Sequence, residues 1–324
     1  MKLLSLESLA SLWVTVFALL AFGLGTVLVL KMGFTPTEVL ALPFAILCIN
    51  LLAAIIHTPS FRGEWALMVF HIALLVIILL TGLSRMTYLK GRFELAAGEQ
   101  FTGRLLYREN GPWHDISVLE QLPFKHISIE VKYKADGKRG KTNNVVLWQA
   151  DSNEKYKAVI GDGKPLYLKG YRILPTRHFG FSPLFGWQPA DGSPLSLGTV
   201  NLPSLRLGSG LSTNWKIPGT TLDILTMLEL KTPIPNPEQK SVFSTPVEHK
   251  LRVSLLGKSY VMKPGDRLNT PEGLLIYEKL GTWVGYTIFY DITIPWLLAS
   301  CVIAVFALMV HFLTKYKHNP WDKE

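Results

Sequence analysis

The sequence predicts a membrane protein with four transmembrane α-helices, three N-terminal and one C-terminal, and a β-rich extracytoplasmic domain between them. Two observations predict this class. Four apolar stretches of about 20 residues, the length of a bilayer span, contain no Asp, Glu, Lys or Arg. The segment between the third and fourth stretches is polar and carries strand patterns separated by turn signals. We therefore expect three helices in residues 1–84, the β-rich domain in 85–291, and the last helix with a short tail in 292–324.

The four apolar stretches are long enough to cross a bilayer as helices. A helix rises ~1.5 Å per residue, so ~20 residues cover a hydrocarbon core of ~30 Å. Backbone amides in lipid find no water to bond, which favours helices. The stretches are Ser11–Leu30, Val39–Ile56, Trp65–Leu83 and Ile292–Leu313.

The basic residues near these stretches predict the orientation. With a cytoplasmic N-terminus, the inside segments hold five Lys or Arg, and the short outside loop holds only Lys31. This distribution follows the positive-inside rule. The five are Lys2, Arg62, Lys315, Lys317 and Lys323. We expect a multi-pass protein of the cytoplasmic (inner) membrane, with both termini in the cytoplasm and the large domain on the extracytoplasmic, periplasmic side.

Charge and cysteine content constrain the large domain. Between Arg85 and Asp291 it has 27 Lys and Arg against 19 Asp and Glu. This excess suits either solubility beside an anionic membrane or attraction to an anionic ligand or acidic partner. Cys48 and Cys301, the two cysteines, both lie in apolar stretches. The domain therefore has no disulfide, no thiol redox pair and no cysteine-ligated zinc.

The large domain contains several predicted strands. Residues 126–134 alternate apolar and polar side chains, as a half-buried strand does. One β-sandwich-like or barrel-like domain accommodates these segments, and only Thr221–Leu230 has a helical pattern. The other predicted strand regions are Lys141–Ala150, Lys155–Gly161, Leu166–Leu174, His249–Tyr260 and Leu274–Tyr290.

No common catalytic motif is present. The sequence lacks a P-loop, a G-x-S-x-G elbow, an H-E-x-x-H helix and a C-x-x-C pair. Nothing in it indicates a nucleic-acid partner, and the sequence identifies no particular residue as catalytic.

The histidines are the candidate site residues. His71 lies six residues after Trp65, or ~9 Å into the third stretch. An ionisable residue there is costly and marks a functional candidate, since neutral imidazole binds haem iron. The alternative is a histidine bonded to a neighbouring helix. His311 in the fourth stretch lies near the same membrane face, and His57 ends the second. The remaining histidines show no metal-site spacing; they are His114, His126, His178 and His249.

Three segments resemble the ResB family (CcsB-like), which handles haem in System II cytochrome c biogenesis. Phe70–Gly82 is similar to the family's third span, a histidine followed by an apolar run that ends at glycine. Gly91–Glu99 follows the family's G-x-x-x-L-x-x-G-E pattern. Trp283–Asp291 resembles its closing W-x-G-Y…Y-D-P strand, with Ile292 in place of the proline. The order of spans and domain also matches.

The resemblance implies a subunit of a cytochrome c synthase and haem export complex. Such a subunit, haem-ligating or non-catalytic, helps move haem b across the membrane and presents it for covalent attachment to apocytochrome c. Its expected partners are a ResC- or CcsA-like membrane protein with a tryptophan-rich haem-binding segment, the apocytochrome, and a thiol-reducing thioredoxin-like protein.

The resemblance also implies site residues. His71 stands where the family has an axial haem ligand whose counterpart comes from the partner. His311 is a second candidate ligand if the fourth helix packs on the third, and Arg62 or another interfacial cation is expected to hold the propionates. Two alternatives stay open: a scaffold or binding module that holds apocytochrome c without binding haem, and a membrane-anchored sensor.

Overall fold

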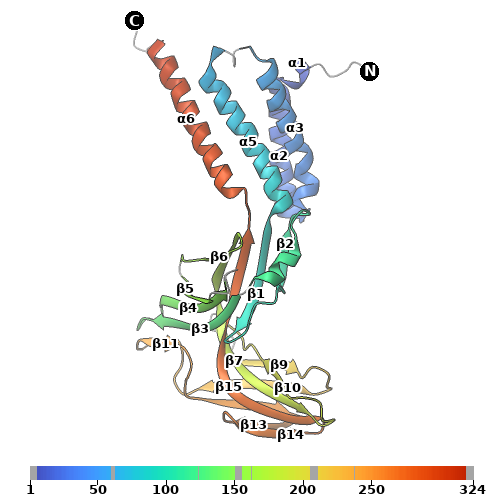
Figure 1. Ribbon diagram of the computed structural model, residues 1–324, viewed down its shortest axis with the longest axis vertical. Helices are drawn as coiled ribbons and strands as arrows, with labels where there is room; N and C mark the ends of the chain where they lie inside the picture. Colours follow the sequence, from blue (N-terminus) through green and yellow to red (C-terminus); the bar gives the residue numbers. More distant parts are fainter. Residues whose placement is uncertain are drawn as a thin grey trace. The chain divides into compact units, whose positions relative to one another are not determined.

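The computed structural model describes residues 6–59, 63–122, 124–149, 155–161, 163–204, 211–236 and 238–318, and it confirms the predicted fold class. Figure 1 shows its helices and strands. The chain divides into two compact units. The helical unit comprises residues 1–88, 110–114 and 291–324, and the β unit comprises residues 89–109 and 115–290.

The four predicted spans are helices that are long and apolar enough to cross a membrane. Ser11 caps the first of them, where its Oγ accepts a hydrogen bond from Trp13 N, and Gly33 ends it in the left-handed conformation. The described helices are α1 (Leu6–Leu9), α2 (Leu12–Met32), α3 (Pro36–His57), α5 (Trp65–Thr87) and α6 (Ile294–His318).

Helix α5 contacts both α3 and α6, and α2 packs on α3 (Figure 1). Asn50 of α3 is buried, yet its amide is satisfied. Its Oδ1 accepts from Thr15 Oγ1, and its Nδ2 donates to the carbonyls of Leu9 and Ser11. These bonds hold the start of α2 against α3, which is how a polar side chain is accommodated in a span.

Helices α5 and α6 run antiparallel along a shared seam. Ser84 near the end of α5 donates to Asp291 just before α6. At the other end of the seam, Glu64 before α5 contacts His311 near the end of α6. The buried residues of α6 lie on one side of the helix and are small, which allows close approach of the two helices; they are Ser300, Ala304 and Ala307.

Among the described residues, the β unit contains three antiparallel sheets, where we expected one β-sandwich-like or barrel-like domain. The largest has seven strands in the order β2-β1-β15-β7-β6, with β14 on β15 and β8 on β7. Its strands are β1 (Leu89–Ala96), β2 (Tyr107–Asn110), β6 (Leu166–Leu168), β7 (Tyr171–Pro189), β8 (Ser196–Thr199), β14 (Arg267–Thr270) and β15 (Gly273–Tyr290).

The two smaller sheets have four strands each. Their orders are β13-β12-β10-β9 and β11-β3-β4-β5. A short 3-10 helix, η1 (Ile116–Gln121), precedes β3. The strands are β3 (Phe124–Tyr133), β4 (Arg139–Gln149), β5 (Lys155–Ile160), β9 (Ser212–Lys216), β10 (Asp223–Leu230), β11 (Ser241–Phe243), β12 (His249–Leu255) and β13 (Lys258–Met262).

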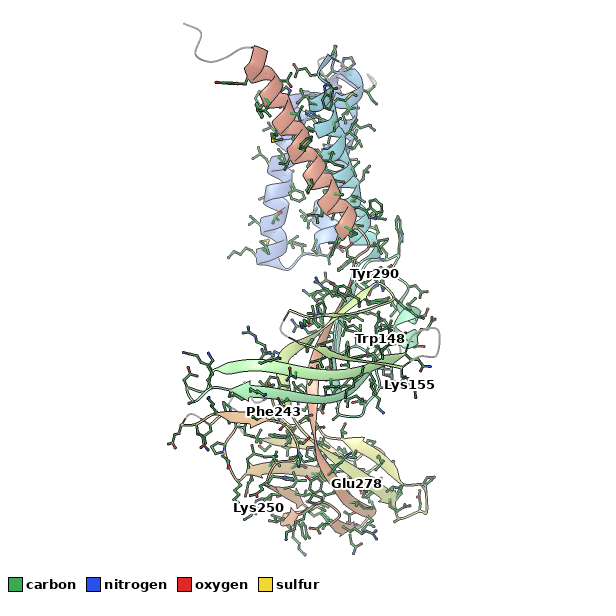
Figure 2. The ribbon with its side chains drawn as sticks, turned by 60° about the vertical axis from the view of Figure 1, so that its left-hand side comes forward. Trp148, Lys155, Phe243, Lys250, Glu278 and Tyr290 are labelled. Atoms are coloured by element: carbon green, nitrogen blue, oxygen red, sulfur yellow. The ribbon has the colours of Figure 1, made fainter. Side chains whose placement is uncertain are left out.

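The long strands β7 and β15 form the centre of the largest sheet, with two irregularities in their register. Strand β15 also pairs with β1, from Leu89 opposite Tyr290 to Ala96 opposite Trp283. The second and third segments of the family resemblance are therefore neighbours in one sheet. Aromatic rings fill the core beneath it; Phe243, labelled in Figure 2, packs 5.0 Å from Phe179 and 4.8 Å from Phe181 between ring centroids.

The predicted strands are confirmed, but the one helix predicted in this domain is not. Residues 166–174 form β6, a turn and the start of β7, and residues 249–260 form β12 and most of β13. The helix predicted at Thr221–Leu230 is wrong, because Asp223–Leu230 is strand β10. Its buried residues alternate with exposed ones, and hydrogen-bonded neighbours on both sides override the helical preference of its Leu, Met and Glu residues.

Candidate functional site

His71 is a candidate residue that lies within a predicted span, helix α5. Its Nδ1 lies 2.7 Å from the carbonyl oxygen of Leu67, one turn earlier on α5. A carbonyl oxygen only accepts, so this bond requires the proton on Nδ1. The lone pair of the neutral ring is then on Nε2. Histidines that bind metals are commonly held in this way, with the other ring nitrogen donating to a backbone carbonyl.

His71 lies on the side of α5 that faces α3. Gly82 is eleven residues, or about three turns, after His71 and so shares its side. A Cβ at Gly82 would lie 3.6 Å from the ring of Phe44 on α3. Ser84, which bonds to Asp291 before α6, points to the opposite side of α5. The imidazole of His71 is half-buried, and the edge of the Phe70 ring is 5.3 Å away between centroids.

His311 is held by a carboxylate at the start of α5. Its Nδ1 lies 3.0 Å from Glu64 Oε2, and its side chain is 13% exposed. Nδ1–H donates to the carboxylate, which leaves the lone pair of the neutral ring on Nε2. A carboxylate behind an imidazole fixes the orientation of the ring and its tautomer. His311 thus has ligand chemistry similar to that of His71.

The two histidines do not share one side of the helix pair. The bonds at the two ends of the seam place Ala304 level with His71 in the antiparallel register. His311 is seven residues further along α6, or about 10 Å along the helix axis. The fourth helix does pack on the third, which was the condition for His311 as a second ligand. Because His71 faces α3, however, the structure does not bring the two imidazole rings together.

The other histidines have different settings. His57 is exposed at the end of α3, and His178 is exposed on β7. His114 Nδ1 donates to Thr87 O at 2.8 Å. The ring nitrogens of His249 lie 2.6 Å from Val247 O and 2.7 Å from Tyr277 Oη. Among the described residues, no three His, Cys, Asp or Glu side chains gather as metal ligands. Arg62, predicted to hold propionates, lies outside the described residues.

The sequence did not reveal a buried polar cluster in the β unit. Tyr286 Oη lies 3.0 Å from His126 Nδ1 and accepts from Asn144 Nδ2 at 2.9 Å. His126 and Asn144 are completely buried, and His126 Nε2 has no partner within the described part of the chain. Burial lowers the pKa of His126 to about 4, opposed by its hydrogen bond to Asn144, so the ring is neutral at pH 7. Only the W-x-G-Y segment pointed to Tyr286.

Tyr286 is also the hub of an aromatic cluster. Its ring stacks on Phe93 of β1 at 5.1 Å and meets Phe124 of β3 edge-on at 5.2 Å, between centroids. Burial raises the pKa of Tyr286 far above its usual value, so the phenol stays protonated. The cluster connects the largest sheet to the β3–β4 sheet and has no access to solvent, which is the setting of a structural element.

The comparisons with known proteins add little. No family model matches the sequence, and no curated protein matches it. The fold search finds a similarity to a cytochrome c haem lyase, CcmF, with 11% identity and a TM-score of 0.27. The similarity covers 91% of this chain and 34% of that one, so this chain spans about a third of that protein's length. We therefore infer the function of this chain from its own residues.

Proposed function

We propose that this chain is a haem-handling subunit of a cytochrome c synthase complex, with His71 as an axial ligand to haem b. It helps move haem across the cytoplasmic membrane and presents it for covalent attachment to apocytochrome c. The observation that carries the proposal is the bond from His71 Nδ1 to Leu67 O at 2.7 Å, which leaves the lone pair of a membrane imidazole on Nε2. Haem is the transported substrate.

The proposed orientation places both termini in the cytoplasm and the β unit outside. The Lys and Arg distribution around the spans supports it. His71 is six residues into α5, so haem bound there lies in the cytoplasmic half of the bilayer. The haem plane is apolar, but its propionates are charged. A site near one membrane face lets those charges reach interfacial cations while the ring stays in an apolar setting.

The second axial ligand at His71 comes from another protein in this proposal. His71 faces α3, whereas His311 lies on the α5–α6 seam beside Glu64. A ResC- or CcsA-like membrane protein would supply the opposite ligand and the tryptophan-rich haem-binding segment. It would also carry out thioether formation with the thiols of the apocytochrome, which a thioredoxin-like protein keeps reduced.

The charge of the β unit favours a second candidate role, that of a scaffold. Its excess of Lys and Arg suits an acidic client, such as an apocytochrome or another exported protein. A scaffold would hold this client without binding haem itself.

Haem content of the purified complex separates the two roles. The full chain is purified with its co-purifying membrane proteins, and haem b is quantified by its absorption spectrum. His71→Ala should lose most of the haem, whereas His178→Ala, a change at an exposed histidine of the β unit, should retain it. Full haem content and continued cytochrome maturation in His71→Ala would favour the scaffold.

A further inference from the structure

The segment Asn110–His114 begins at the last residue of β2 and precedes η1, within the sequence of the β-rich domain, but it belongs to the helical unit. Gly111 N donates to Tyr88 O, and Trp113 N donates to Met86 O, both at 2.9 Å. The side chain of His114 donates to Thr87 O at 2.8 Å. Three consecutive carbonyls at the end of α5 thus have donors from this segment. Such carbonyls have no donor within their own helix, so a partner is required there.

Gly111 permits this close approach. A Cβ at position 111 would overlap the backbone carbonyls of Met86 and Arg85. The segment therefore lies directly against the helix end, and the turn that begins at Gly111 carries Trp113 outward. Its indole is 68% exposed although it is large and apolar. Its position is fixed by the backbone bond to Met86.

The level of Trp113 along the helical unit follows from these bonds. Helix α5 has 23 residues and is about 34 Å long, close to a bilayer thickness. Trp65, at its beginning, is also strongly exposed. Trp113 lies at its other end, and so does the exposed Trp296, because Ser84 and Asp291 tie the start of α6 to the end of α5. Trp residues at both ends of a span are typical of the two membrane–water interfaces.

Other groups at this end of α5 suit the same environment. The guanidinium of Arg85 lies 4.7 Å from the ring centroid of Tyr88 and donates to its hydroxyl at 2.7 Å. A cation and aromatic rings with polar tips at one depth match the headgroup layer. The exposed apolar surface of α5 and α6 continues up to this level.

We propose that Trp113, with the exposed Pro112 beside it, forms an interfacial anchor that inserts into the headgroup layer of the bilayer. The occupant of this surface is lipid. The anchor holds at the membrane a segment of the β-rich domain's sequence that is not adjacent in sequence to a hydrophobic span. This inference needs only that α5 crosses the membrane and is independent of haem binding.

The experiment measures the depth of position 113 in the full chain in lipid nanodiscs. Cys48 and Cys301 are replaced by Ala, and Trp113→Cys carries a nitroxide label. Collisions with oxygen and with a water-soluble nickel complex give the depth by electron paramagnetic resonance. Leu79→Cys, at an exposed position within α5, gives the lipid reference. Leu256→Cys, in an exposed turn of the β unit, gives the aqueous one.

We expect the label at position 113 to give a depth between the two references, at the headgroup level. Adding Gly111→Ala should shift it toward the aqueous reference, because the segment can no longer lie against α5. Gly198→Ala, where a Cβ meets no atom within 4 Å, should leave it unchanged. Nickel accessibility at position 113 equal to that at Leu256 would overturn the anchor. An unchanged depth in Gly111→Ala would overturn its proposed attachment to α5.

Discussion

Ser84 Oγ donates a hydrogen bond to Asp291 Oδ2 at 2.7 Å, although the two residues are 207 positions apart. The other carboxylate oxygen of Asp291 accepts from the backbone and the hydroxyl of Thr293, at 2.9 and 2.7 Å. One carboxylate thus ties the end of α5 to the beginning of α6.

Replacing Asp291 by Ala removes all three bonds. Because hydrogen bonds to a charged group each contribute about 1.5–3 kcal/mol, we expect a loss of at least about 2 kcal/mol in the free energy of unfolding. The measurement is the unfolding midpoint of the helical unit in mixed micelles, followed by circular dichroism. Asp223→Ala, at an exposed end of β10, is the matched control. Equal midpoints for the two variants would contradict this role of Asp291.

His126 makes the β unit sensitive to acid. Its pKa is about 4 in the folded protein against an ordinary value of 6.5, because burial disfavours the charged ring. The stabilisation from the neutral ring is therefore complete above pH 6.5 and is lost as the pH falls toward 4. The loss is at most about 3 kcal/mol, since one pKa unit corresponds to about 1.4 kcal/mol.

The measurement is the thermal midpoint of the β unit between pH 7 and pH 4. We expect the midpoint to fall over this range in the wild type and in His178→Gln, and to fall less steeply in His126→Gln. A wild-type slope in His126→Gln would show that other groups cause the acid sensitivity.

Tyr286→Phe tests the buried cluster itself. The ring stays, but Asn144 and His126 lose the hydroxyl that they contact. A buried polar group without a partner costs about 1–3 kcal/mol, and we expect the free energy of unfolding of the β unit to fall by an amount in that range. Chemical unfolding of the β unit, monitored by tryptophan fluorescence, measures it. Tyr260→Phe, on the exposed strand β13, is the control and should have nearly the stability of the wild type. Equal stabilities of the two variants would show that the hydroxyl of Tyr286 contributes nothing to stability.

Local patterns predicted the elements of this protein better than their assembly. The spans follow from charge-free apolar stretches, and residues 126–134 follow from alternation, because both signals arise within one element. Residues 221–230 were predicted wrongly because their strand conformation depends on β9 and β12, which lie elsewhere in the sequence. The three-sheet arrangement likewise depends on long-range pairings.

Of the candidate site, the sequence likewise revealed only what is local to one element. His71 is conspicuous because it is ionisable within a span. Its bond to Leu67 and its side of α5 depend on the folded helix, and the contact of His311 with Glu64 depends on the packing of α6 against α5. The cluster at Tyr286 joins residues 142 and 160 positions apart, and the attachment of Trp113 to α5 joins a helix end to a distant turn. No sequence period reports such contacts.

The central proposal, that His71 binds haem iron, is tested most directly by adding free imidazole to a variant that lacks the His71 side chain. In His71→Gly, imidazole added to the purified complex can occupy the position of the missing ring, as a free ligand for haem iron. We predict that this variant loses haem absorbance, and that imidazole restores binding of added haem with a spectrum that indicates nitrogen ligation. His178→Gly should keep its haem and show no response. Wild-type haem content and spectrum in His71→Gly without imidazole would contradict His71 as a haem ligand.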